Sequence, residues 1–542
     1  MRRLLVLLPV LGWVAGCAAD DAGASLGASA SDAGAGKAIC ISDEECGEGE
    51  VCFAGNCVFQ GERPSERDAG VSEEERSFAA YTVPAAGGEH VWVAAPQIDT
   101  LVRIHAETLA LSAIEVGDEP TEVRAVPDGD TVVVLNRGSD ELAVVRSPDE
   151  VDFVLLPGHF NALTLSPDGG FAFCWFDLEQ ARRGEDAASL QDLAVVDLDT
   201  SAVHAVTVGF RPRRIAFTAD GATALVVTDD GISSFRPAEL RGSLLATTVP
   251  VAPDVFSQVD REVALTPDGA FAVSRGPGEL GVTIVDLGEG TPRFVELGAE
   301  PTDLDLLPDG RTALVMLRDA ARLALVPVET AVQDPETIRF VEFPGQVLGS
   351  AALAGGFALL YTTLDEARAQ VSLLDLDTEV IVHRPLRKGV AGVEVAPTGR
   401  QAIIVHTKAE GVPDPAEGED AFLARSHAYT LLDVRTTLTK LQTTPAQAQG
   451  IVFSAERDEA FLVLRDTGVA EVQRIDLNGF SVESYTLGTP PEVVGVLPEV
   501  ARAFVTQTHP EGRISFIHLE AEAGDGGRLE TVSGYTLNGR ID

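Results

Sequence analysis

The tetrapeptide Ser166-Pro-Asp-Gly169 decides the fold of this chain, because close copies of it return at intervals along the sequence. The other clear copies are Val126-Pro-Asp-Gly129, Thr218-Ala-Asp-Gly221, Thr266-Pro-Asp-Gly269 and Leu307-Pro-Asp-Gly310. Proline presets φ for a tight turn, the aspartate side chain bonds to the backbone, and glycine tolerates a positive φ. A turn that recurs in this way indicates a repeat fold.

Weaker copies continue the series. Ala396-Pro-Thr-Gly399 keeps the turn, while residues 85–88, 353–356, 454–457 and 497–500 hold equivalent places with poorer turn chemistry. The third residue of each turn stands at 87, 128, 168, 220, 268, 309, 355, 398, 456 and 499. The steps between them run from 40 to 58 residues. The chain therefore holds ten units.

Each unit reads as strand, turn, strand, loop, strand, turn, strand. Arg214-Ile-Ala-Phe217 precedes one turn, and residues 222–227 follow it. A third strand often ends in aspartate, as in Val282-Thr-Ile-Val-Asp286, and a fourth ends at a glycine-to-proline corner such as Gly209-Phe-Arg-Pro212. Four short strands in about 40 to 45 residues are typical of a β-propeller blade. We expect an all-β propeller of about ten four-stranded blades over residues 78–542.

The turn, the Val-Asp-Leu strand end and the glycine-to-proline corner together resemble the YVTN type of β-propeller repeat. The resemblance covers residues from about 78 to 542. Most units lack the Tyr-Val and Asn landmarks of that repeat, and ten units exceed the usual four to eight blades. A seven- or eight-bladed ring with flanking sheet is the alternative architecture.

The N-terminus predicts export. Arg2 and Arg3 precede an apolar run from Leu4 to Val10, and small residues lead to Cys17. This pattern is a signal peptide over residues 1–16, and it resembles a bacterial lipoprotein leader, which implies a lipid on Cys17. Ala18 after the cysteine implies outer-membrane sorting, with the protein facing either the periplasm or the outside. An ordinary secretory signal is the alternative, and no other stretch reaches the ~18 apolar residues of a membrane span.

Residues 17–77 form a separate segment. From Ala18 to Ser77 the sequence is rich in Ala, Gly, Ser, Asp and Glu, which predicts a disordered, acidic tether. Cys40, Cys46, Cys52 and Cys57 lie within it. Four cysteines so close together in an exported chain favour two disulfides in a small knot, and their spacing does not fit a structural zinc site. Three pairings are open, of which we prefer first with third and second with fourth.

Charge excludes one class of partner. The 542 residues carry 40 Lys and Arg against 84 Asp and Glu, a net charge of −44. Nucleic-acid binding needs clustered basic residues and is excluded. An anionic surface favours a soluble monomer. Three tryptophans, one of them in the leader, are too few for a stacked-aromatic cofactor site.

Two long insertions, residues 178–191 and 408–425, fall between the second and third strands of their units. In a propeller these loops share one end with the connections between blades, whereas the Pro-Asp-Gly turns lie at the other end. Loops carry function more often than the sheets beneath them, although insertions are also simply tolerated there. The candidate binding residues are Arg182, Arg183, Glu185, Asp186, Lys408, Asp414 and Glu417.

The chain shows no local catalytic motif. Its nine histidines are scattered, and the sequence has no metal-binding His pair, no haem motif, no Gly-x-Ser-x-Gly elbow and no P-loop. We therefore predict no catalytic residue, metal or cofactor. Asp303 and Asp305 beside Asp309 could suggest calcium, but Asp303 and Asp305 lie on a strand rather than in a calcium loop, so we interpret all three acids as solvated. Cys174, in an apolar strand, is interpreted as a buried core thiol.

The sequence thus supports a non-enzymatic, membrane-anchored propeller that acts as a binding or scaffold module in the cell envelope. The alternative is a periplasmic lactonase-type hydrolase that uses residues dispersed around the channel. This second function rests only on analogy with the fold of other propellers, and propellers host many functions.

Overall fold

The computed structural model describes residues 50–53, 56–59, 83–127, 131–182, 185, 187, 189–252, 261–343, 350–362, 368–454, 456–520 and 528–535. The chain divides into two compact units, Met1–Gln60 and Gly61–Asp542. In the first unit the described strands are β1 (Glu50–Phe53) and β2 (Asn56–Phe59), which pair antiparallel with Cys52 opposite Cys57. Cys17, Cys40 and Cys46 lie outside the described residues.

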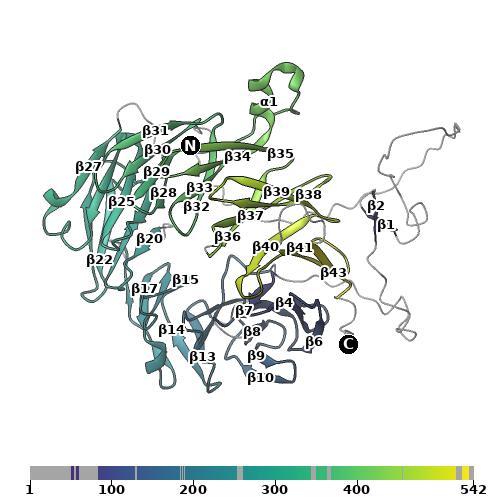
Figure 1. The fold of residues 1–542 in the computed structure, drawn as a ribbon. Helices are drawn as coiled ribbons and strands as arrows, with labels where there is room; N and C mark the ends of the chain where they lie inside the picture. The colour runs from purple at the N-terminus through teal and green to yellow at the C-terminus, as the bar shows by residue number, and fades with distance from the viewer. Residues whose placement is uncertain are drawn as a thin grey trace, which may run out of the picture. The chain divides into compact units, whose positions relative to one another are not determined.

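The second unit holds ten antiparallel sheets of four strands, one of which gains a fifth (Figure 1). Blades 1 to 3 contain β3 (Ala85–Gly87), β4 (His90–Ala95), β5 (Thr100–His105) and β6 (Leu111–Glu115); β7 (Pro120–Ala125), β8 (Val132–Asn136), β9 (Glu141–Ser147) and β10 (Glu150–Leu155); and β11 (Ala162–Leu165), β12 (Phe171–Trp175), β13 (Asp192–Asp197) and β14 (Val203–Thr207). Blades 4 to 6 contain β15 (Pro212–Phe217), β16 (Ala224–Thr228), β17 (Gly231–Phe235) and β19 (Thr248–Val249); β20 (Glu262–Leu265), β21 (Phe271–Arg275), β22 (Gly281–Asp286) and β23 (Thr291–Glu296); and β24 (Asp303–Leu306), β25 (Thr312–Leu317), β26 (Arg322–Pro327) and β27 (Arg339–Glu342).

The remaining four blades follow the same order along the chain. They contain β28 (Ser350–Ala354), β29 (Phe357–Tyr361), β30 (Gln370–Asp375) and β31 (Ile381–Pro385); β32 (Val390–Val395), β33 (Gln401–His406), β34 (His427–Asp433) and β35 (Thr439–Thr444); β36 (Ala448–Ser454), β37 (Glu459–Asp466), β38 (Val469–Asp476) and β39 (Ser481–Thr486); and β40 (Pro491–Leu497), β41 (Arg502–Gln507), β42 (Arg513–His518) and β43 (Leu529–Ser533). Short helical segments lie between strands: η3 (Pro237–Glu239), η4 (Arg318–Ala320), η5 (Pro335–Thr337), η7 (Pro415–Glu417), α1 (Glu419–Arg425) and η8 (Pro498–Val500). The all-β propeller with ten blades is confirmed, and the seven- or eight-bladed alternative is wrong.

The fifth strand belongs to blade 3. The connection between β17 and β19 runs outward through η3 and β18 (Leu244–Leu245). Strand β18 pairs parallel with β14, at the outer edge of blade 3. Blade 4 therefore covers the backbone edge of its neighbour, which leaves fewer unpaired strand groups there.

Ten buried apolar clusters within the described residues join the blades, one at each junction. The cluster between blades 10 and 1 packs Phe504 and Phe516 against Val91 and Ile104. In Figure 1 the last strands lie beside the first ones, and β3 contacts β40. The ring is thus closed by side-chain packing between two blades that are each made from one continuous stretch of chain.

The repeated turns have the geometry that their residues demand. Gly169 has φ of 71°, a left-handed conformation that glycine adopts without steric cost. The Asp168 carboxylate accepts hydrogen bonds from the Gly170 N–H at 3.1 Å and from the Ser166 hydroxyl at 2.6 Å. These hydrogen bonds lower the pKa of Asp168. The same bonds recur around Asp220 and Asp268.

Candidate binding face

The connections of an antiparallel blade alternate between its two ends. The loops between second and third strands, and the connections from blade to blade, lie at the end that we call the insertion face. Residues 178–191 follow β12 and precede β13, and residues 408–425 lie between β33 and β34. Both insertions are therefore on the insertion face, as the sequence predicted.

The first insertion is attached to blade 2 by a cluster of charged side chains. The Arg137 guanidinium donates two hydrogen bonds to the Glu185 carboxylate. His159 lies between two acids, with Nδ1 2.6 Å from Asp140 Oδ1 and Nε2 2.8 Å from Glu185 Oε1. We call Arg137, Asp140, His159 and Glu185 the Glu185 cluster. It joins the loop after β8, the connection before β11, and the first insertion.

Burial makes this cluster stronger than a surface ion pair. The side chains of Arg137 and Glu185 are 7% and 11% exposed. Burial alone raises the pKa of Glu185, but bonds from the Arg137 side chain, the Arg182 N–H and His159 outweigh it and lower that pKa to about 2. Burial likewise opposes the charge on His159, yet its bonds to Glu185 and Asp140 raise its pKa overall. The contacts with Glu185 and Asp140 therefore favour the protonated form of His159.

Such an arrangement positions a loop rather than performing chemistry. Both ring nitrogens of His159 contact carboxylates, so the ring cannot accept a substrate proton without losing one contact. Arg182 extends the attachment, since its side chain donates to Glu119 and its N–H donates to Glu185 at 2.7 Å. Two of the candidate binding residues, Arg182 and Glu185, are thus brought together. Arg183 and Asp186 lie outside the described residues.

The second insertion contains η7 and α1, and α1 stands off the ends of β33 and β34 (Figure 1). Lys388 is 5% exposed, and its ammonium donates to the Leu423 carbonyl and, at 3.0 Å, to the Ala424 carbonyl. These carbonyls belong to the last turn of α1, where a cation is favourable, and each also accepts a backbone N–H, from Ser426 and Ala409 respectively. Arg387 adds an exposed ion pair with Glu419.

The remaining candidate residues lie on this insertion but not beside the first one in any described contact. Lys408 is exposed. Asp414 is exposed and caps η7 by accepting a bond from the Ala416 N–H at 2.8 Å. Glu417 pairs with Arg425 within the insertion. Val412 lies between Lys408 and Asp414 in the sequence, and 81% of its surface is exposed.

The first strands of the blades, around the central axis, carry acids that the sequence analysis interpreted wrongly. Asp303 and Asp305 on β24 are partly buried, and Asp303 accepts a hydrogen bond from the Ala351 N–H at 2.7 Å. Burial raises the pKa of Asp303. Burial, with the neighbouring charges of Asp303 and Glu262, raises the pKa of Asp305 to about 6. The interpretation of Asp303 and Asp305 as solvated carboxylates is therefore wrong, because first strands face inward and crowd these acids together.

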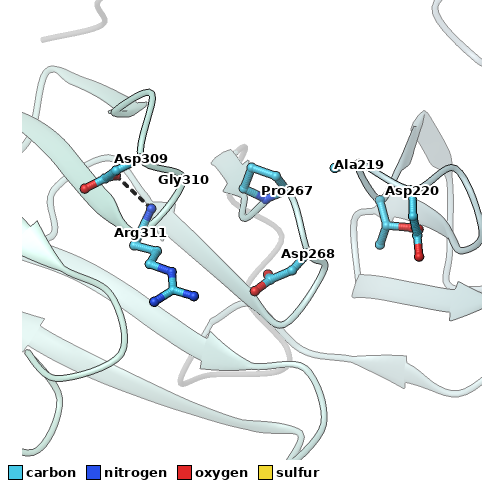
Figure 2. A pocket seen from close by; sticks show the side chains of 8 residues that line it. Ala219, Asp220, Pro267, Asp268, Asp309, Gly310 and Arg311 are labelled. Atoms are coloured by element: carbon cyan, nitrogen blue, oxygen red, sulfur yellow. Dashed lines mark hydrogen bonds between the residues drawn. The ribbon is translucent and has the colours of Figure 1, made fainter. Parts of the chain in front are cut away.

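The opposite end holds a pocket between the repeated turns of blades 4, 5 and 6. Figure 2 shows Asp220, Asp268 and Asp309 around it, with Arg311 beside them. Its volume is about 390 Å³. Each of these aspartates already accepts backbone hydrogen bonds within its own turn. The pocket is a by-product of three adjacent turns and offers no convergent chemistry.

Within the described residues, no group of His, Cys, Asp and Glu is arranged to hold a metal ion. Cys174 is a buried free thiol whose pKa burial raises, as expected. Trp92 and Trp175 are core residues, at 0% and 7% exposure. In the part of the chain that the structure describes, no helix combines the length and the apolar character of a membrane span.

Sequence reasoning missed Arg137, Asp140 and His159. They lie 48, 45 and 26 residues before Glu185, and no motif links them. The order of strands within each repeat could have located them, because Arg137 and Asp140 follow a second strand and His159 precedes a first strand. All three therefore had to lie on the insertion face beside blade 3.

No protein-family model matches the chain, and no curated protein matches its sequence. Among solved structures, the chain is similar to a eukaryotic initiation factor at 12% identity, covering 80% of this chain and 94% of that one, with a TM-score of 0.46. It is also similar to the dihydro-heme d1 dehydrogenase NirN (10% identity, 64% and 72% coverage, TM-score 0.39) and to AztD from Citrobacter koseri (12%, 64% and 92%, 0.37). These likenesses are too distant to say what this chain binds or does.

Proposed function

We propose that this protein is a lipid-anchored, non-enzymatic binding module of the bacterial cell envelope, whose insertion face docks an envelope protein or another surface component. The leader and Cys17 support the anchor, and Ala18 supports the outer membrane. The observation that carries the binding role is that propeller side chains hold both insertions in defined positions. A loop fixed before binding loses less conformational entropy when it meets a partner.

The second insertion supplies the chemistry for such contact. Val412 is apolar and 81% exposed. Around Val412 the exposed carboxylates of Asp414, Glu417 and Asp420 give the surface a negative charge. A partner with basic groups around an apolar pocket complements this surface, because charge complementarity guides association and an apolar anchor supplies affinity.

Crosslinked capture from isolated envelopes tests the binding role. The full-length chain is expected to retain a partner that residues 1–77 alone do not, and Val412→Asp is expected to lose it. Leu438→Asp, which changes an exposed residue in the β34–β35 hairpin at the opposite end of the propeller, is the matched control. Absence of a partner above the 1–77 control, or equal retention by Val412→Asp, contradicts the proposal.

Fractionation tests the anchor separately. Cys17→Ser is expected to move the protein from the outer-membrane fraction to the soluble envelope fraction, because it removes the thiol that takes the lipid. Unchanged membrane association in this variant contradicts lipid anchoring and leaves the binding test unaffected.

One observation favours the second candidate, a periplasmic lactonase-type hydrolase. Asp305 has a pKa raised to about 6, and a carboxyl poised near neutral pH suits general acid–base catalysis. A lactone and ester screen tests this role: Asp305→Asn is expected to abolish any hydrolysis, and the rate of the wild type should change near pH 6. Hydrolysis that Asp305→Asn retains, or no hydrolysis, excludes it.

A further inference from the structure

A buried arginine at the insertion-face end of blade 10 has no acid paired with it among the described residues. Arg513 begins β42 and is 6% exposed. Its Nε is enclosed and forms no hydrogen bond. Within the described residues, no carboxylate or carbonyl accepts a hydrogen bond from its guanidinium. Burial lowers the pKa of Arg513, and no acid opposes that effect.

The same position in blade 6 also holds an arginine, and there the residue has partners. Arg322 begins β26, also a third strand, and lies against Gly298 of its blade-to-blade corner as Arg513 lies against Gly488. Its Nη2 donates to the Leu297 carbonyl at 2.8 Å, and its guanidinium stacks on Phe340 at 4.2 Å. Arg513 has the equivalent place without the equivalent partners.

The wall around Arg513 is shaped to leave its guanidinium room. A Cβ on Gly488 would lie 2.7 Å from Arg513 Nη1. Gly488 has no positive φ, and the absence of a side chain there lets the Arg513 guanidinium lie close to the corner. The neighbouring His509 has a pKa lowered to about 4 by burial and by the Arg513 charge. The ring is therefore neutral at neutral pH, and Arg513 carries the positive charge of this corner.

An uncompensated buried charge is costly, since the desolvation penalty is not repaid by a partner. Two other guanidiniums with little exposure, those of Arg137 and Arg261, are each paired with a glutamate. In a chain with a net charge of −44, no described acid is paired with Arg513, although Glu511 lies in the same turn and Glu492 accepts a hydrogen bond from the Thr508 hydroxyl at 2.9 Å. An arginine without a paired acid is suited to bind an anion from solution.

We propose that Arg513 forms a binding site for a small oxyanion, a carboxylate or a phosphate, at the corner of Gly488 and the 508–512 turn. The planar guanidinium can pair with either group through two parallel N–H bonds. The Thr508 N–H donates to the Pro490 carbonyl at 2.8 Å and so holds the turn against the corner. The site does not depend on the proposed docking function.

Thermal unfolding of the full-length protein tests this site, with acetate or inorganic phosphate compared with chloride at equal ionic strength. A bound anion stabilises the native state in proportion to its saturation. We expect acetate, phosphate or both to raise the midpoint of the wild type by about 2 °C or more. The matched control Arg322→Gln should keep this rise, and Arg513→Gln should lose it. The two anions distinguish a carboxylate ligand from a phosphate ligand.

A second measurement keeps the test decisive without a ligand. In chloride, Arg513→Gln should unfold at the same temperature as the wild type or higher, because it removes an unpaired buried charge. Arg322→Gln should unfold at a lower temperature, because it loses a carbonyl bond. An anion effect retained by Arg513→Gln, no anion effect at all, or destabilisation or misfolding of Arg513→Gln in chloride overturns the proposal.

Discussion

The two insertions occupy the same place in their blades, yet different chemistry holds each of them. Residues 178–191 depend on the Glu185 cluster, in which charged side chains from two blades meet. Residues 408–425 depend mainly on Lys388, which reaches backbone carbonyls at the end of α1. The first insertion is held through the side chain of Glu185, whereas the second is held through backbone carbonyls at the end of α1. The first attachment should therefore be strong and sensitive to pH, and the second weaker and local.

The largest expected effect comes from removing the central carboxylate. Glu185→Ala leaves the Arg137 guanidinium buried without its partner, which typically costs about 3 to 5 kcal/mol. Urea unfolding should show this as a lower midpoint. Asp152→Ala, which breaks the exposed pair with Arg146 at the edge of blade 2, is the control and should change little. Similar midpoints for the two variants would mean that the Glu185 cluster does not hold the insertion.

The second attachment should fail more locally. Lys388→Met removes two charge-assisted hydrogen bonds from the end of α1, at a cost of about 2 kcal/mol. Hydrogen exchange should speed up in residues 408–425 and stay unchanged in residues 178–191. Lys408→Met, an exposed change in the same insertion, is the control. Exchange that speeds up equally in both insertions would show that they are coupled.

The two attachments should respond to pH in opposite directions. The pKa of His159 is raised in the folded state, so its contribution is full below the ordinary histidine value of 6.5 and is lost as the pH rises through the raised pKa. The pKa of His406, at the base of the second insertion, is lowered to about 4, first by burial and then by the Lys388 charge. Its contribution is full above 6.5 and is lost as the pH falls toward about 4.

Proteolysis across this pH range measures the difference. The first insertion should become more cleavable at alkaline pH, and the second at acid pH. His159→Gln should remove only the alkaline response, and His406→Gln only the acid one. If both insertions respond in the same direction, the assignment of these histidines is wrong.

The smallest effect is expected from the exposed pair of the second insertion. Arg387→Gln breaks contacts with Glu419 and Asp420, whose charges are screened by water. The unfolding midpoint should stay within experimental error. A clear decrease would show that Arg387, rather than Lys388, holds α1 in place.

The sequence predicted the fold well because the decisive information is local. The side chain of Asp168 and the φ of Gly169 complete their turn within five residues, so each repeat can be identified without knowing its neighbours. The position of both insertions follows from the same count of strands. What required the structure was contact across blades, because Glu185 belongs to blade 3 and Arg137 to blade 2.

Asp305 is a second residue whose surroundings the sequence of one repeat did not predict. An acid on a strand next to a second acid is easily interpreted as solvated, because alternation places it away from the apolar face. Burial is the main cause of the raised pKa of Asp305, and the charges of Asp303, on the same strand, and of Glu262, in another blade, add to it. The sequence of one repeat shows neither the burial nor the contact with the next blade.

The closure of the ring has a practical consequence for engineering. Blade 1 and blade 10 are each complete, and the junction between them is made of side chains such as Phe516 and Val91. None of the described strands crosses that junction to interlock the ends. Circular permutants that join the two blades with a short linker and open the chain at another blade-to-blade corner should therefore refold, since every cut leaves ten whole blades.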